Sequence, residues 1–228
     1  MKNIFINTRW KASIIFLLIS ISLSWPLKFF PEYFNSLFAP INSLTLDIRI
    51  LLIMWGPGIS GIICGFLFRR TKRKYFTLFG DNILLSILFY LTPWSIFGLM
   101  LVINDLPGNM SLKSFLLMAV ISFFMILGQE IGWRGFLQSI LGNLTKLEKW
   151  VWIGLLFSVW SIKLEWFNEG VLNYSFMIIL TIFGNILLAN VLGELAERTK
   201  SLLVPMSMHT WILAIFDIPY INTYITAF

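Results

Sequence analysis

Long apolar runs, separated by short polar loops, recur along almost the whole chain and limit the folds that it can adopt. A helix needs about 20 apolar residues to span a bilayer core, and several of the runs approach or exceed that length. Backbone polar groups find no partner in hydrocarbon, so such runs cross a membrane as helices with internal hydrogen bonds. We therefore predict an all-α, polytopic transmembrane helix bundle that forms a single domain over residues 1–228.

Hydropathy indicates about seven spans, of which the fourth is expected to continue as helix through Leu141. The first follows basic residues but lacks a small-residue cleavage site, so we interpret it as a retained signal anchor. The tail Asp217–Phe228 is expected to be a half-helix or an interfacial segment. The spans are predicted at Ala12–Phe30, Leu44–Phe68, Ile83–Ile103, Leu112–Gly128, Trp150–Phe167, Val171–Leu192 and Leu202–Phe216.

The charge of the chain fits a membrane protein with basic loops on one side. Charged residues make up 12% of the chain and the mean hydropathy is +0.83, whereas a soluble domain has roughly 25% charged residues. The net charge of +6 requires no nucleic acid partner, because Lys and Arg collect in cytoplasmic loops. We predict a multi-pass protein of the cell membrane that is surrounded by the lipid bilayer. Its N-terminus is predicted to be cytoplasmic, because this orientation places three basic regions inside: the run Arg69–Lys74 and the loops near Lys146 and Arg198.

An acid and a base stand four residues apart at the end of the fourth span. Glu130 and Arg134 share one helix face at this spacing and are within reach of an ion pair. Placing an ionisable group within the membrane costs free energy, so such a group is interpreted either as tightly paired or as functional. The spacing alone favours a structural salt bridge over a site in which Glu130 is a base or a ligand. The neighbouring Gln129 presents a neutral donor and acceptor.

The remaining candidates for chemistry are few. His209 is the only histidine, and a lone histidine near the end of a span is more often a hydrogen-bonded structural residue than a ligand. Glu165, at the end of the fifth span, is expected to be an interfacial charge. Asn185 and Asn190, and Glu194 beyond them, either line a polar interior or hydrogen-bond between helices. The lone cysteine, Cys64, excludes an intramolecular disulfide and a thiolate metal cluster.

Three short motifs at these residues resemble those of the CPBP family, the CAAX-prenyl-protease-like and Abi (bacteriocin-processing) intramembrane metalloproteases. The resemblance covers about residues 115–216 and implies a bundle of about eight membrane helices around a central polar cavity. The family pattern is Glu-Glu-x-x-x-Arg, then Phe-x-x-x-His, then His-x-x-x-Asn/Asp, each on a different helix. The matching segments here are Gln129–Leu137, Phe157–Ser161 and Glu197–His209.

The resemblance also implies which functions are lost. The family's water-activating base falls on Gln129, and a carboxamide cannot accept a proton at neutral pH. The histidine of the second motif falls on Ser161, and the Asn or Asp of the third falls on Leu213. Of the implied catalytic set, Glu130, Arg134 and His209 remain, with His209 as the one candidate metal ligand. Zinc protease sites normally use three protein ligands.

We therefore expect a pseudoprotease that binds no metal but keeps the family scaffold. This scaffold is expected to bind a peptide, a lipidated peptide segment or a membrane partner. Bacteriocin immunity is one role that the resemblance implies. The alternative is an active zinc metalloendopeptidase with a rearranged site. In that case Glu130 takes over as the base, and Glu165, four residues beyond Ser161, becomes a ligand beside His209.

Overall fold

The computed structural model describes residues 2–39, 48–69, 76–103, 112–162 and 171–212 of the chain. These residues form helices joined by short turns, and the only β-type pairing among them consists of isolated bridges between Thr77 or Phe79 and Ser201. The predicted all-α class is thereby confirmed. The predicted central polar cavity stays a prediction.

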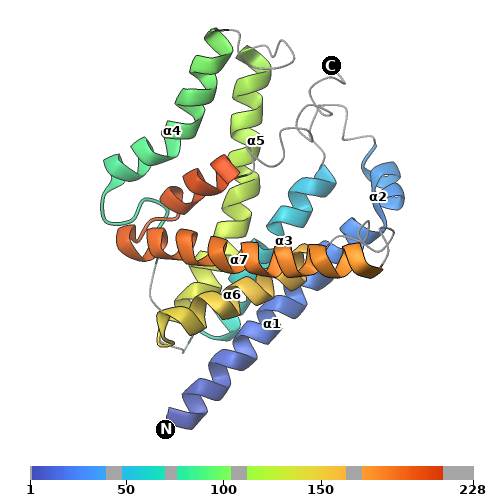
Figure 1. The fold of residues 1–228 in the computed structure, drawn as a ribbon, viewed down its shortest axis with the longest axis vertical. Coiled ribbons are helices and arrows are strands. Elements are labelled where there is room, and N and C mark those ends of the chain that lie inside the picture. The colour runs from blue at the N-terminus through green and yellow to red at the C-terminus, as the bar shows by residue number, and fades with distance from the viewer. Residues whose placement is uncertain (1, 40–47, 70–75, 104–111, 163–170, 213–228) are drawn as a thin grey trace.

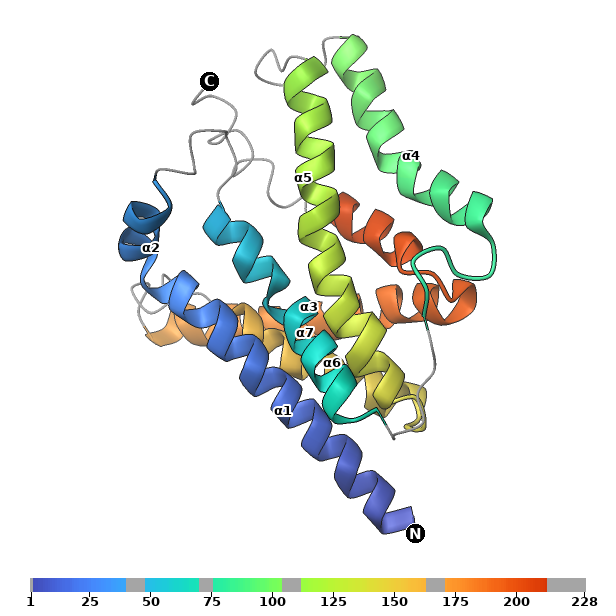
Figure 2. The ribbon, with the colours of Figure 1, turned by 180° about the vertical axis from the view of Figure 1, so that it is seen from behind.

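Figures 1 and 2 show how the helices are arranged. α1 packs along α3, α3 packs against α5 and η2, and α6 packs against α7. The last described helix, at residues 203–212, lies beside α5 on the side that faces α4. The elements are α1 (Lys2–Phe29), α2 (Pro31–Phe38), α3 (Ile48–Leu67), α4 (Ile83–Val102), α5 (Leu112–Glu130), the π-helix η2 (Ile131–Gln138), α6 (Lys146–Ser161) and α7 (Val171–Thr199).

Four of the described helices are long and apolar enough to cross a membrane, and they correspond to the first, second, fourth and sixth predicted spans. The third predicted span forms a shorter apolar helix, and the fourth continues past Glu130 as the π-helix. The described part of the seventh is the helix at 203–212. The four long spans are Thr8–Phe29, Ile48–Leu67, Phe115–Gln138 and Tyr174–Thr199.

The helices at the fifth and sixth predicted spans have other ends than hydropathy indicated. The fifth span was predicted at Trp150–Phe167, but α6 ends at Ser161. It begins at Lys146 because Thr145 and Glu148 form a reciprocal capping box. The sixth was predicted to end at Leu192, but α7 continues to Thr199 through residues that form ion pairs with α6. Residues 163–170 and the tail after Ile212 lie outside the described part of the chain.

Small residues allow α3 to approach the fourth span closely. A Cβ atom on Gly58 would lie 2.6 Å from the carbonyl oxygen of Gly128, and one on Gly132 would lie 2.3 Å from that of Pro57. Membrane helices gain little from hydrophobic association, so close van der Waals packing at small residues is a main source of their attraction. The backbones of α3 and of the α5–η2 segment are therefore in direct contact.

Serine side chains join α1 to α3 on the opposite side of α3. Ser24 donates its hydroxyl to the carbonyl of Ile53 at 3.0 Å, and Ser60 donates to the carbonyl of Phe16 at 2.6 Å. Both serines are fully buried. These bonds satisfy hydroxyl groups that would otherwise be costly in an apolar environment, and they place α3 between α1 and the α5–η2 segment.

We predict that Gly132→Ala destabilises the protein by about 1–3 kcal/mol, because the added methyl group overpacks the contact with α3. Gly184→Ala is the matched control, since a Cβ there meets nothing within 4 Å and alanine favours a helix over glycine. Thermal unfolding in detergent measures both variants. Equal melting temperatures for the two would contradict the close approach of the helices.

Candidate functional site

Glu130 ends α5, and the chain continues directly into η2, where the helix widens to π geometry. Single turns of π-helix occur mostly inside α-helices and often at functional sites. Arg134 lies on this wider turn, and its Nε is 3.4 Å from Glu130 Oε2. Both side chains are at most 3% exposed, so the predicted ion pair is present and buried.

His209 completes a group of three buried polar side chains. Its Nδ1 lies 2.9 Å from Glu130 Oε1, and the residue is only 4% exposed. An ionised carboxylate can only accept hydrogen bonds, so with Glu130 ionised the proton of the imidazole is on Nδ1. The carboxylate of Glu130 thus bridges a guanidinium on its own helix and an imidazole from a helix 79 residues away in the sequence. We call Glu130, Arg134 and His209 the Glu130 cluster.

A short segment before α4 holds the turn that leads to His209. Thr77 accepts a backbone hydrogen bond from Leu202 at 2.9 Å and donates one to Lys200 at 3.0 Å. The Ser201 hydroxyl donates to the carbonyl of Leu78 at 2.9 Å. Gly80 has a φ of +66°, and a Cβ there would lie 2.1 Å from the carbonyl oxygen of Thr199. This pairing fixes the start of the helix that carries His209.

A second contact supports the same helix further along. Ser207 donates its hydroxyl to the carbonyl of Phe89 on α4 at 2.6 Å. The sequence analysis did not identify the segment at 76–82 or α4 as supports for the site. Gly80, followed by the polar pair Asp81 and Asn82, was the available signal, because glycine is typical of a turn with positive φ.

Gln129 is buried beside the Glu130 cluster but has different partners. The residue is 3% exposed, and its Nε2 donates to Met54 Sδ on α3. Its carbonyl oxygen is buried and has no hydrogen-bond partner within the described residues. The amide is therefore held against α3, where it offers one unused acceptor.

Ser161 takes part in a polar contact between α6 and α7. Its hydroxyl donates to the carbonyl of Ser158 at 3.1 Å and accepts a bond from Asn185 Nδ2 at 3.2 Å. Asn185 also donates to the Ser158 hydroxyl at 3.2 Å. Ser161 forms no hydrogen bond with the Glu130 cluster. Asn185 thus forms hydrogen bonds between helices, while Asn190 is exposed.

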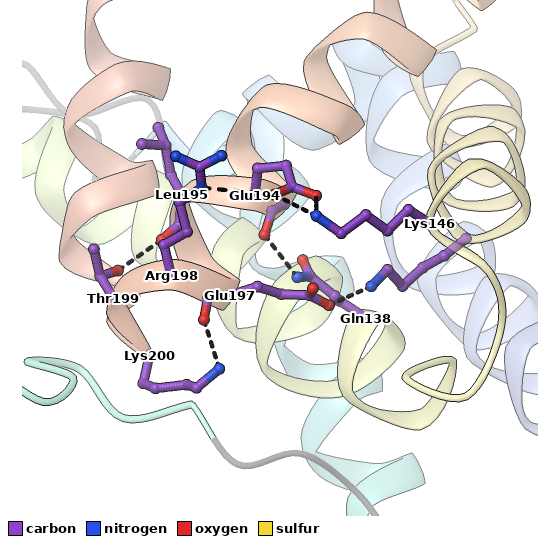
Figure 3. A network of polar contacts seen from close by, with 10 residues as sticks. Gln138, Lys146, Glu194, Leu195, Glu197, Arg198, Thr199 and Lys200 are labelled. Carbon is purple, nitrogen blue, oxygen red and sulfur yellow. Dashed lines mark hydrogen bonds and ion pairs between the residues drawn. The ribbon is translucent and has the colours of Figure 1, made fainter.

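Glu194 belongs to an ion-pair network near the end of α7, which Figure 3 shows. It pairs with Lys146 at 2.7 Å and with Arg198 at 3.7 Å, while Glu197 pairs with the buried Lys149. The two basic loops that were predicted to face the cytoplasm therefore meet at one end of the bundle. Their side of the membrane stays a prediction.

The described residues do not by themselves supply the ligands of a catalytic zinc ion. Among the described residues, no group of three His, Cys, Asp or Glu side chains is arranged to hold a metal. Glu130 and His209 supply two donors at most, and one oxygen of Glu130 already faces Arg134. A catalytic zinc normally has three protein ligands. Two further positions, Glu165 and Leu213, lie outside the described residues.

We predict that Glu130→Ala and Arg134→Ala each destabilise the protein by about 3–5 kcal/mol, because each change leaves the other charge buried and unpaired. Arg198→Ala is the matched control: Arg198 follows Glu194 at the same spacing but is 78% exposed, so its loss costs at most about 0.5 kcal/mol. Chemical or thermal unfolding in detergent compares them. Wild-type melting in both cluster variants would show that the pair is solvated.

One comparison with known proteins found a similar family. Residues 111–215 match the family model described as type II CAAX prenyl endopeptidase Rce1-like. No curated protein and no solved structure matches the chain. The matched segment contains all three motifs that carried the resemblance, including the Glu130 cluster. Residues 111–215 are therefore similar to the type II CAAX prenyl endopeptidases, and this match is consistent with the resemblance to the CPBP family.

Proposed function

We propose that this protein keeps the membrane scaffold of the CAAX-protease-like family and has lost, or greatly weakened, the peptidase reaction. In this role it binds a peptide, a lipidated peptide segment or a membrane protein partner. Bacteriocin immunity is one biological setting that the family resemblance implies. The observation that carries the proposal is that the surviving motif side chains bond to one another or to neighbouring helices.

The Glu130 cluster supports the loss of metal chemistry. Glu130 bonds to His209 and pairs with Arg134, so its carboxylate acts between helices. If Nε2 of His209 were to bind a metal, Glu130 would orient the imidazole from behind, as carboxylates commonly do in zinc sites. That arrangement would leave a single protein ligand from the cluster, which is too few for a stable catalytic zinc.

Gln129 supports the loss of base catalysis. Peptide hydrolysis at neutral pH needs a group that accepts a proton from the attacking water, and a carboxamide does not. The amide nitrogen of Gln129 is bonded to Met54 on α3, so the side chain contributes to helix packing. Its buried, unpartnered oxygen offers an acceptor for an N–H or O–H group of a bound molecule.

Ser161 supports the same conclusion at the second motif. Its hydroxyl is used between Ser158 and Asn185, and it bonds α6 to α7. A serine hydroxyl is a poor zinc ligand beside imidazole, thiolate and carboxylate, the ligands that zinc sites in proteins use. The second motif thus contributes to the scaffold, as the proposal requires.

We predict that the purified protein, dialysed against zinc and then against buffer, retains no stoichiometric zinc and cleaves no prenyl-protease or leader-peptide substrate. Metal content by mass spectrometry and peptide cleavage in proteoliposomes measure this. The proposal is wrong if specific proteolysis is present and is abolished by a chelator. It is also wrong if His209→Ala removes such activity without changing the melting temperature.

Restoring the family's side chains tests the same proposal from the opposite direction. Gln129→Glu alone should give no activity, because a base without a positioned water has nothing to deprotonate. The triple variant Gln129→Glu, Ser161→His and Leu213→Asn should gain measurable zinc binding, while activity stays weak because supporting residues are not tuned to it. Zinc titration compares the single variant, the triple variant and the unmodified protein. Activity in the single variant would contradict the proposal.

A further inference from the structure

α2 is a short helix with two apolar surfaces that face different surroundings. Phe34 and Phe38 are partly buried and pack against the main hydrophobic core. Phe30, just before the helix, and Tyr33 and Leu37 within it are 64%, 66% and 54% exposed. Tyr33 and Leu37, four residues apart, lie on one stripe of the helix, and Phe30 is the N-cap three residues before Tyr33. We call Phe30, Tyr33 and Leu37 the outer stripe.

The rest of the helix circumference is polar. Glu32, Asn35 and Ser36 are exposed, and they lie on the side opposite the two apolar surfaces at helical periodicity. Around its axis, α2 therefore presents protein contacts, then the outer stripe, then a polar face. A helix in a purely aqueous setting gains nothing from three large exposed apolar side chains on one stripe.

The position of α2 in the chain places it where two membrane spans reach the bilayer surface. The span Thr8–Phe29 ends two residues before α2 begins, and the next span along the chain is Ile48–Leu67. Arg49, near the start of that second span, donates to Asn35 Oδ1 at 2.9 Å. α2 is thus bonded to the end of one span and follows directly from the end of another (Figure 2).

Aromatic and basic side chains collect at the same end of the bundle. Trp25 Nε1 and Lys28 Nζ donate to the carbonyl of Trp160 at 3.3 and 2.5 Å, and the Lys28 ammonium lies 4.1 Å from the centre of the Trp160 ring. Trp and Tyr are enriched where a membrane meets water, and basic side chains at span ends extend toward that level. This end of the bundle has the composition of a membrane–water interface.

We infer that α2 lies in the plane of the bilayer surface, with the outer stripe embedded at the boundary between lipid headgroups and acyl chains and with the polar face toward water. Amphipathic helices bind membranes in this orientation, with the apolar face buried about 5–10 Å into the boundary. Here the helix is also attached to two spans, so it anchors the ends of α1 and α3 at one depth. The partner of this surface is the lipid of the same bilayer.

Site-directed spin labelling of the full-length protein in phosphatidylcholine–phosphatidylglycerol vesicles tests this inference. The background is Cys64→Ala, because Cys64 is the only cysteine. Labels at Tyr33→Cys and Leu37→Cys report on the outer stripe, and labels at Glu32→Cys and Ser36→Cys report on the polar face. All four side chains are exposed, so these substitutions remove no buried packing. Ile179→Cys on α7, which is 65% exposed, is the reference for a lipid-facing position.

The expected result is an oxygen-to-nickel-chelate accessibility ratio that is several-fold higher at Tyr33 and Leu37 than at Glu32 and Ser36, and that approaches the value at Ile179. Equal access of the nickel chelate to both faces would overturn the inference, because α2 would then lie in water. Low access of both reagents at the outer stripe would also overturn it, because protein rather than lipid would cover the stripe. If Cys64→Ala fails to fold, the labels are introduced with Cys64 in place, since that side chain is fully buried.

Discussion

The carboxylate of Glu130 is fully buried in the bundle, and the positions of several helices depend on how its charge is compensated. Removing a charge from water costs several kcal/mol even in a relaxed protein interior, and close partners with good geometry must offset that cost. Arg134 supplies the opposite charge from the next helical turn, and His209 supplies a hydrogen bond from a distant helix. The helix at 203–212 must therefore remain where its imidazole reaches α5, and the turn that precedes it is fixed by backbone pairing with Thr77 and Leu78.

The packing around this cluster uses a different kind of interaction. Glycines at the contact between α3 and the α5–η2 segment bring the two backbones together, and serines bond α1 to the other side of α3. This combination is effective in a membrane, because lipid solvates apolar side chains as well as another helix does. Close van der Waals contact and hydrogen bonds are then the interactions that favour association of the helices. The chain also pairs its charges where the helices reach the surface, as Lys149 and Glu197 do between α6 and α7. Polar groups thus connect the helices both at the centre of the bundle and at one end of it.

The proposed function follows from how these polar groups are used. In a hydrolytic site, a base and metal ligands must keep atoms available for water and substrate. Here Glu130 and His209 bond to each other, Ser161 bonds to Asn185, and the amide nitrogen of Gln129 bonds to Met54. Two atoms of the first motif, the side-chain oxygen of Gln129 and the indole nitrogen of Trp133, are buried without a hydrogen-bond partner among the described residues. Such an arrangement favours contacts between helices over the activation of water.

The sequence by itself determined the membrane class, the all-α fold and the ion pair of Glu130 with Arg134. The composition and length of the apolar runs indicate that the helices lie in lipid. The spacing of four residues between Glu130 and Arg134 predicts their contact, because it depends on the geometry of one helix only. The motifs indicated the family that the comparison then found. Hydropathy missed the start of α6, although the capping box of Thr145 and Glu148 is a local signal in the sequence. The end of α7 depends on ion pairs to another helix, which the sequence did not determine. The sequence also did not determine that His209 reaches Glu130 while Ser161 turns to Asn185. Those contacts join residues far apart in the chain, so the close packing of the helices in the tertiary structure decided them.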